Sequence, residues 1–226
     1  TKTTMEIEAK ERIVDQTGFD ALRHALGTPE TAVRQRNVFL DDDAGTLRAA
    51  RICLRLRFYE EPAAKAGTCL VTCKRGHTLR DGVAQAQEDE DTVPAAVAHA
   101  ALAAPDVGAL AAHSAVLAAA LRESRGPVHA YADFVTYREA YPMSAVATLA
   151  HASPAEAKTV AALRVEVDRT TYPFGATAFE VEIEGRTPAE VAAARTLLAR
   201  VLDSLSVAHH PTTRCKLACF VTRVID

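Results

Sequence analysis

Long hydrophobic runs, tryptophan and an excess of one charge are all missing from this sequence of 226 residues. No stretch reaches the roughly 18 uninterrupted apolar residues of a membrane-spanning helix, because prolines and polar residues interrupt the alanine-rich region after Thr92. The formal net charge of −3 argues against a broad nucleic-acid-binding face, which needs an excess of lysine and arginine. We therefore expect no membrane segment and no nucleic acid as the main ligand.

Cysteine usage and the first residues indicate a compartment. Because the sequence begins on a strand-like segment, we expect no apolar leader. Its five cysteines, an odd number, lie in apolar-rich segments, which favours reduced thiols and a cytoplasmic location. The C-x-x-x-C pairs Cys69/Cys73 and Cys215/Cys219 raise a zinc site as the alternative, but structural zinc prefers tighter spacings and a closed set of four ligands.

Alternating apolar and polar residues predict that strands dominate the chain. Met5–Ile13 alternates most strictly, and a surface excursion with one short helix is predicted over 141–162. We predict about eight mostly antiparallel strands and three to five helices in a single domain spanning 1–226. The other predicted strands cover 32–40, 50–59, 69–74, 83–90, 128–137, 163–169 and 178–184.

Capping residues and prolines predict where the helices begin. Thr17 is predicted to cap a helix over 19–26, and Pro105 divides the region 92–123 into two helices. Ser153 with Glu156, and Thr187 with its following proline and glutamate, are typical helix starts. The second of these opens the best-defined helix, which is predicted to end near residue 205. His77 is predicted in a turn, 209–211 in a loop, and the final segment covers 215–225.

Several predicted strands carry charge at every second position. The simple interpretation is a half-solvated sheet with its charged face outward. The charges are segregated, however, with carboxylates on some strands and bases on others. The carboxylate-rich runs are Glu6/Glu8 with Lys10, Glu166/Asp168 and Glu180/Glu182/Glu184, and the basic run is Arg55/Arg57.

Segregated charge favours a ligand-binding face over a solvated one. Adjacent carboxylates repel unless a cation lies between them, and oxygen ligands suit Mg²⁺ or Mn²⁺. Adjacent arginines suit a polyanion, since planar guanidinium groups match phosphate oxygens. If the sheet closes into a barrel, these faces all point inward.

In order along nearly the whole chain, these motifs resemble the CYTH family, the triphosphate tunnel metalloenzymes, and especially its plant and algal members. The E-x-E-x-K motif is Glu6, Glu8 and Lys10. The remaining matches are L-R-x-R at 54–57, T-C-K at 72–74, the acidic pair Glu88 and Glu90, Arg138, the runs at 165–175 and 179–184, and Lys216.

The resemblance implies a mainly antiparallel α+β fold, an eight-stranded closed barrel with helices packed outside. It also implies that Glu6, Glu8, Glu180 and Glu182 hold one divalent metal, and that Glu90 and Asp168 lie near a second metal or the attacking water. Glu88 is the alternative to Glu90 on the same strand face. Phosphate-binding residues would be Lys10, Arg55, Arg57, Lys74, Arg138 and Lys216, and the catalytic candidates are Glu90, Asp168 and Lys216.

The resemblance therefore predicts a metal-dependent triphosphatase acting on a small molecule, as a monomer or weak dimer. With no tryptophan and 5% aromatic residues, a substrate without an organic head, inorganic tripolyphosphate, is favoured. Phe58, Tyr59 and Tyr172 remain available to stack on a ring. Thiamine triphosphate hydrolysis, nucleoside triphosphate hydrolysis or cyclisation, and non-catalytic polyphosphate binding stay open as alternatives. Gln85 and Gln87 depart from the basic residue that relatives often carry on that strand.

Overall fold

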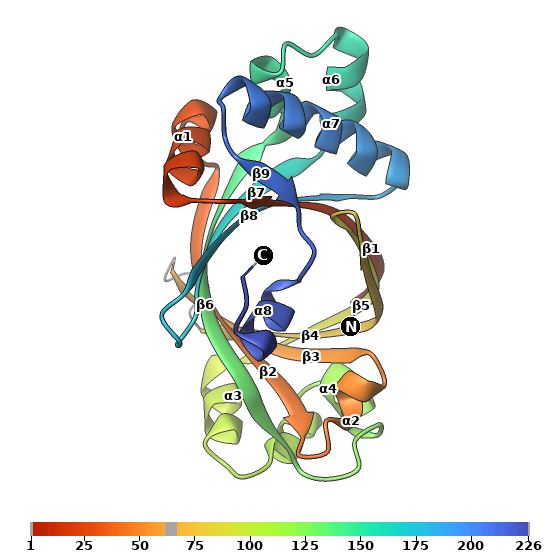
Figure 1. Cartoon of the computed structure of the whole chain (residues 1–226). Coiled ribbons are helices and arrows are strands. Elements are labelled where there is room, and N and C mark those ends of the chain that lie inside the picture. Colours follow the sequence, from red (N-terminus) through yellow and green to blue (C-terminus); the bar gives the residue numbers. More distant parts are fainter. Residues whose placement is uncertain (1, 62–66, 226) are drawn as a thin grey trace. The chain divides into compact units, whose positions relative to one another are not determined.

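The computed structural model describes residues 2–61 and 67–225 (Figure 1). Its strands form one antiparallel sheet in the order β5-β4-β3-β2-β6-β7-β8-β1-β9, and β5 also pairs with β1. Eight strands thus close into a barrel, and β9 is added beside β1. The predicted α+β fold class and closed antiparallel barrel are confirmed. The strands are β1 (Lys2–Ile13), β2 (Thr31–Asp42), β3 (Ile52–Glu61), β4 (Thr68–Arg80), β5 (Val83–Pro94), β6 (Val128–Pro142), β7 (Arg164–Thr171), β8 (Thr177–Gly185) and β9 (His209–Pro211).

The described residues contain more helices than the three to five predicted. The alanine-rich region forms three short elements where two were predicted, because Asp106 and Ser114 each cap a new start with their side chains. The helices are α1 (Gln16–Leu26), α2 (Thr46–Ala49), α3 (Ala95–Leu102), the 3-10 helix η2 (Val107–Ala112), α4 (Ala115–Leu121), α5 (Met143–Leu149), α6 (Pro154–Val160), α7 (Pro188–Ser204) and α8 (Lys216–Thr222).

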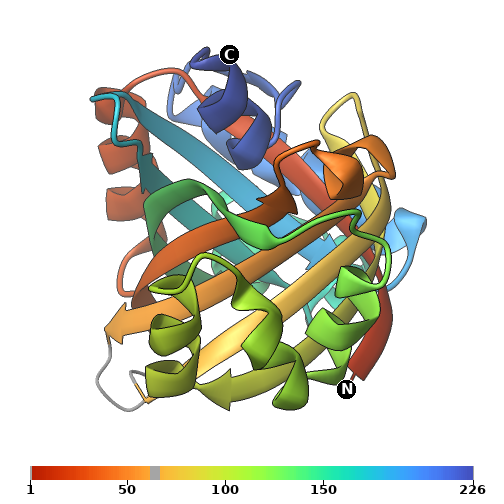
Figure 2. The same cartoon turned by 90° about the horizontal axis from the view of Figure 1, so that it is seen from below.

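The chain divides into two compact units. Unit 1 comprises residues 1–5, 33–77 and 86–136, and unit 2 comprises 6–32, 78–85 and 137–226. In unit 1, the apolar faces of β3 and β4 form one core with α3, η2 and α4. These helices lie over the two strands in Figure 2. In unit 2, β7 and β8 form another core with α1, α5, α6 and α7.

The predicted surface excursion over 141–162 is wrong. Its first two residues complete β6, and most of the rest forms α5 and α6, which pack against α7 within unit 2. Tyr141, Met143 and Val146 are fully buried in that core. Small alanine side chains suit a packed helix as well as an exposed one, so the amino-acid composition could not show that this segment is buried. The capping box of Ser153 and Glu156 is confirmed.

Three smaller predictions are also corrected. Asp15, not Thr17, caps α1, because the Asp15 side chain accepts from the Gly18 backbone nitrogen. His77 lies within β4 and not in a turn, although Gly76 there adopts a φ of 62°. The segment 209–211 is the short strand β9, in register with residues 11–13 of β1. Thr187 caps α7 as predicted.

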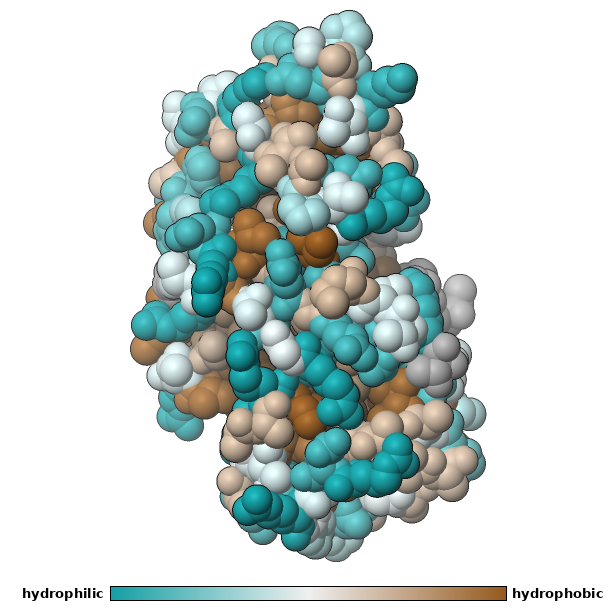
Figure 3. Space-filling view, turned by 90° about the vertical axis from the view of Figure 1, so that its right-hand side faces the viewer, coloured by the Kyte–Doolittle hydropathy of each residue, from teal (hydrophilic) through white to brown (hydrophobic). Residues whose placement is uncertain are grey.

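Surface polarity is mixed, with hydrophilic and hydrophobic residues interspersed over the face drawn in Figure 3. Exposed large apolar side chains include Met5, Val14 and Val221. Within the part of the chain that the structure describes, no helix combines the length and apolar character that a membrane crossing requires. All five cysteines are described and each is a free thiol.

Candidate functional site

The three strands β7, β8 and β1 of unit 2 set charged residues in two cross-strand rows. In one row Asp168 of β7 is opposite Glu180 of β8, and Glu180 is opposite Arg12 of β1. In the next row Glu166 is opposite Glu182, and Glu182 is opposite Lys10. Each row therefore places two carboxylates beside one cation. Paired carboxylates directly opposite each other are destabilising unless a positive charge compensates.

Period two along each strand separates this charged face from the core. Val167, Val181 and Ile183 point to the opposite side and are fully buried in the unit 2 core. The centre of the charged face is buried as well, since Asp168 is 0% and Glu180 1% exposed, whereas Glu184 at the end of β8 is exposed. The half-solvated sheet considered from the sequence is therefore ruled out for the centre of these strands.

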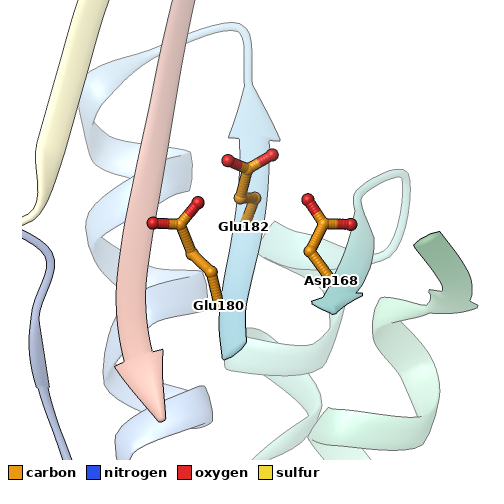
Figure 4. A group of neighbouring side chains, drawn as sticks. All are labelled: Asp168, Glu180 and Glu182. Atoms are coloured by element: carbon orange, nitrogen blue, oxygen red, sulfur yellow. The ribbon is translucent and has the colours of Figure 1, made fainter. Parts of the chain in front are cut away.

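Three of the carboxylates form a candidate metal-binding group. Asp168, Glu180 and Glu182 each offer one oxygen, and these atoms lie within 4.8 Å of one another. Figure 4 shows the side chains on one side of the sheet, two from β8 and one from β7. A set of buried carboxylate oxygens suits a hard divalent cation, so the residues present fit such an ion.

Lys216, the first residue of α8, reaches into this group. Its ammonium nitrogen lies 2.9 Å from Asp168 Oδ2 and 2.6 Å from Glu182 Oε1, and it also donates to Glu180. Burial alone lowers the pKa of Lys216, but the three carboxylates outweigh it and raise the pKa above its ordinary value. Lys216 is therefore a fixed positive charge at the centre of the acidic group.

Arg138 of β6 and Lys10 of β1 supply further positive charge beside these carboxylates. Arg138 pairs with Asp168 at 2.6 Å and also with Glu166 and Glu182. Lys10 lies 2.8 Å from Glu8 Oε1 and donates to Glu182. Burial, the largest influence, opposes the charged forms of both bases, yet the carboxylates raise both pKa values well above normal.

The pKa values of the neighbouring Glu180 and Glu182 are shifted in opposite directions. Burial favours the neutral acid, but Lys10, Lys216 and Arg138 outweigh it and hold the pKa of Glu182 well below normal. The pKa of Glu180 is raised, because burial dominates there and Glu182 adds repulsion. Neighbouring acids with opposite shifts are typical of sites that bind a cation or move a proton.

Unit 1 carries the other predicted phosphate ligands. Arg55 donates to Thr72 Oγ1 at 3.1 Å, and Arg57 donates to Asn37 Oδ1 at 3.0 Å. Lys74 lies 3.6 Å from Glu88 of β5, while Glu90 is half-buried on the same strand. Arg55 Nε is one of the buried side-chain nitrogens that lack a hydrogen-bond partner in the described structure. A buried donor without an acceptor calls for one, so Arg55 is suited to an anion.

A sequence profile of the CYTH domain matches residues 4–209. The chain belongs to the CYTH domain family. This assignment covers both charged strand sets described above and ends before Lys216. CYTH enzymes generally depend on divalent metal, in keeping with the acidic group of unit 2.

Solved structures resemble this CYTH domain along nearly its whole length. A Hippeastrum protein proposed as an adenylyl cyclase, which has a dominant triphosphatase activity, is 26% identical with a TM-score of 0.80, and the match covers 97% of each chain. A proposed adenylate cyclase from Bacillus halodurans is 21% identical with a TM-score of 0.63, covering 97% of this chain and 99% of that one. The second likeness shows the fold alone. A comparison with curated proteins by sequence finds no match.

Most of the residues predicted for the CYTH site in unit 2 meet in one network, and Glu6, 7% exposed, lies on the same face of β1. The assignment of Glu6 and Glu8 to a metal stays a prediction, as do the roles of Glu88 and Glu90. Sequence analysis missed Arg12, which is 1% exposed and lies 3.5 Å from Glu180. The signal was available, because Arg12 continues the alternation of Glu6, Glu8 and Lys10. The network comprises Glu8, Lys10, Arg12, Arg138, Glu166, Asp168, Glu180, Glu182 and Lys216.

Proposed function

We propose that this CYTH domain hydrolyses a linear triphosphate, with inorganic tripolyphosphate as the preferred substrate and Mg²⁺ or Mn²⁺ as the cofactor. The observation that carries the proposal is the unit 2 network, which combines three close carboxylates with four cations, of which Lys10 and Arg12 are buried and Arg138 and Lys216 are partly buried. Carboxylates alone suit a metal and cations alone suit phosphate, whereas a metal–triphosphate complex uses both. The triphosphatase activity of the Hippeastrum protein agrees with this reading.

The proposed reaction is direct displacement by water. Water attacks the terminal phosphorus, the bond to the bridging oxygen breaks, diphosphate leaves with the bonding electrons, and the water proton passes to solvent. A divalent metal would be held by Asp168, Glu180 and Glu182, and when bound it would neutralise phosphate charge and acidify water. Lys10, Arg138 and Lys216 would turn their charges toward the phosphates and stabilise the negative charge of the transition state.

The remaining predicted residues enter the proposal from the family resemblance. Arg55, Arg57 and Lys74 are proposed phosphate ligands, and the unpaired Arg55 Nε supports the first of them. Glu90 is retained as a candidate near the attacking water. The free thiols of all five cysteines agree with a reducing, cytoplasmic setting.

A substrate panel tests the proposal. Phosphate release is measured with tripolyphosphate, thiamine triphosphate and ATP, each with Mg²⁺, with Mn²⁺ and with chelator. We expect release from tripolyphosphate that depends on metal. Cyclic nucleotide formed from ATP would favour a cyclase, and tight tripolyphosphate binding without release would favour a binding module.

Single glutamate-to-glutamine substitutions test whether the carboxylates of the unit 2 network are needed for catalysis. Glu180→Gln and Glu182→Gln should abolish release while tripolyphosphate still binds, because the cations remain. Glu184→Gln is the matched control, since Glu184 is two residues further along β8 and exposed. Equal activity in all three variants would reject the assignment. In ¹⁸O-water, a single turnover should place the label in the released phosphate, and unlabelled phosphate would refute direct attack by water.

A further inference from the structure

An aromatic contact fastens α8 to the turn between β7 and β8. Tyr172 and Phe174 of that turn stack with ring centroids 5.1 Å apart and planes 10° apart. The ring centroid of Phe220 in α8 lies 6.3 Å from that of Phe174, and the two rings are tilted against each other. Such pairs hold two segments together and leave the polar tip of tyrosine available for a hydrogen bond.

The tyrosine hydroxyl makes a specific bond to the helix. Tyr172 is 1% exposed, and its hydroxyl donates to the backbone carbonyl oxygen of Lys216 at 3.1 Å. Burial, with help from the neighbouring Cys219, raises the pKa of Tyr172 above its usual value, so the hydroxyl keeps its proton and stays a donor. The bond therefore fixes the backbone of the residue whose ammonium group enters the acidic cluster.

The backbone position of Lys216 limits which groups its ammonium nitrogen can reach together. Holding a lysine side chain in one arrangement costs up to about 2 kcal/mol of rotamer entropy, so a backbone already fixed at the right place favours that arrangement. Lys216 must reach Asp168, Glu180 and Glu182 together. A shift of about 1 Å in such a group is enough to lower a rate strongly.

We propose that Tyr172 is a positioning residue, whose hydroxyl sets the start of α8 so that Lys216 reaches the phosphate and carboxylate groups of the site. The inference rests on the proposed triphosphatase function. In this proposal Tyr172 acts through the backbone of Lys216. The segment before α8 has an independent anchor, since Arg12 donates to the Arg214 carbonyl at 3.2 Å, so loss of the hydroxyl leaves α8 attached.

Tyr172→Phe removes only the hydroxyl and keeps the aromatic stack. Tyr141→Phe is the matched control, because Tyr141 is also 1% exposed in unit 2 and its hydroxyl donates to Glu139 at 2.7 Å. The first readout needs no activity: acetylation of lysines by an amine-reactive ester, followed by mass spectrometry, with the exposed Lys158 as internal reference. We expect Lys216 to be labelled about three- to tenfold faster in Tyr172→Phe, the range for loss of one hydrogen bond, and unchanged in the control. An equal rate in both variants overturns the proposal.

The second readout is kinetic coupling with Lys216. Tyr172→Phe should lower kcat/KM for tripolyphosphate about three- to tenfold in the wild-type background. In the Lys216→Ala background it should change kcat/KM less than about twofold, because its target is gone. A general structural effect would instead lower both backgrounds equally and overturn the proposal. Faster labelling in a protein that hydrolyses no triphosphate would refute the proposed function and leave the positioning role intact.

Discussion

The partly buried ion pair between Glu139 of β6 and Arg23 of α1 is expected to stabilise unit 2. Glu139 is 3% exposed, and its two oxygens accept from Arg23 Nε and Nη2, each at 2.5 Å. Its Oε2 also accepts from the Tyr141 hydroxyl at 2.7 Å. Glu139→Gln keeps one oxygen acceptor but removes the charge and one arm of the bidentate contact.

The expected loss follows from these contacts. A hydrogen bond to a charged group contributes about 1.5–3 kcal/mol. Because the Arg23 side chain is 35% exposed, solvent screens part of this, and we expect the free energy of unfolding to fall by about 2 kcal/mol. Asp20→Asn is the control. Asp20 contacts the same arginine at 3.5 Å with a side chain that is 54% exposed, so its loss should cost about 0.5 kcal/mol or less.

The stabilisation by the Glu139–Arg23 ion pair should depend on pH, and this dependence can be tested. Burial raises the pKa of Glu139, but the bonds from Arg23 and Tyr141 outweigh it and lower the pKa below normal. A lowered folded-state pKa means that the stabilisation is complete above the unfolded value of about 4.3 and is lost as pH falls through the folded value. Urea unfolding from pH 7 to about pH 3.5 should therefore show wild type and Glu139→Gln converging at the acid end. A stability difference that stays constant over this range would contradict the reasoning.

Three further predictions concern the fold. Gly82→Ala should lower the free energy of unfolding by about 1–3 kcal/mol, because Gly82 has a φ of 71° and an added Cβ would lie 2.6 Å from the Lys10 carbonyl oxygen; urea unfolding measures this, and an unchanged midpoint would contradict it. Ser153→Ala should cost about 1 kcal/mol in the same assay by removing the cap of α6, and a neutral result would show that the capping box adds nothing. Cys69, fully buried with its pKa raised by burial to about 12, should react with iodoacetamide in the native protein far more slowly than the partly exposed Cys215, and equal rates would show that the burial is incorrect.

The charged strand faces could be predicted because they depend on local periodicity, whereas the closed barrel was implied by the family resemblance. Strict alternation along 5–13 and 178–184 determines which side chains share a face, whatever the strands pair with. The ordered motifs then indicated the closed fold. The pairing of Lys10 with Glu182 and of Arg12 with Glu180 depends on register, which alternation alone does not set.

Other features depend on tertiary packing and could not be read from the sequence. The small residues of α5 suit a buried or an exposed helix equally, and only contact with α7 decides. Asp15 and Thr17 are both good caps, and the choice rests on the extended backbone at Asp15. The partners of Lys216 also escaped prediction, because distant residues anchor this part of the chain: Tyr172 bonds to the start of α8 and Arg12 to the segment before it.

The unit 2 network has a consequence for how ligands bind. Lys10 and Lys216 already hold Glu182, so an anion that draws either ammonium group away leaves a buried carboxylate unpaired. A cation that takes the carboxylate oxygens likewise releases those ammonium groups. Two ligands of opposite charge should therefore each tighten the binding of the other by the same factor, and a preformed metal–triphosphate complex should bind better than either ion alone.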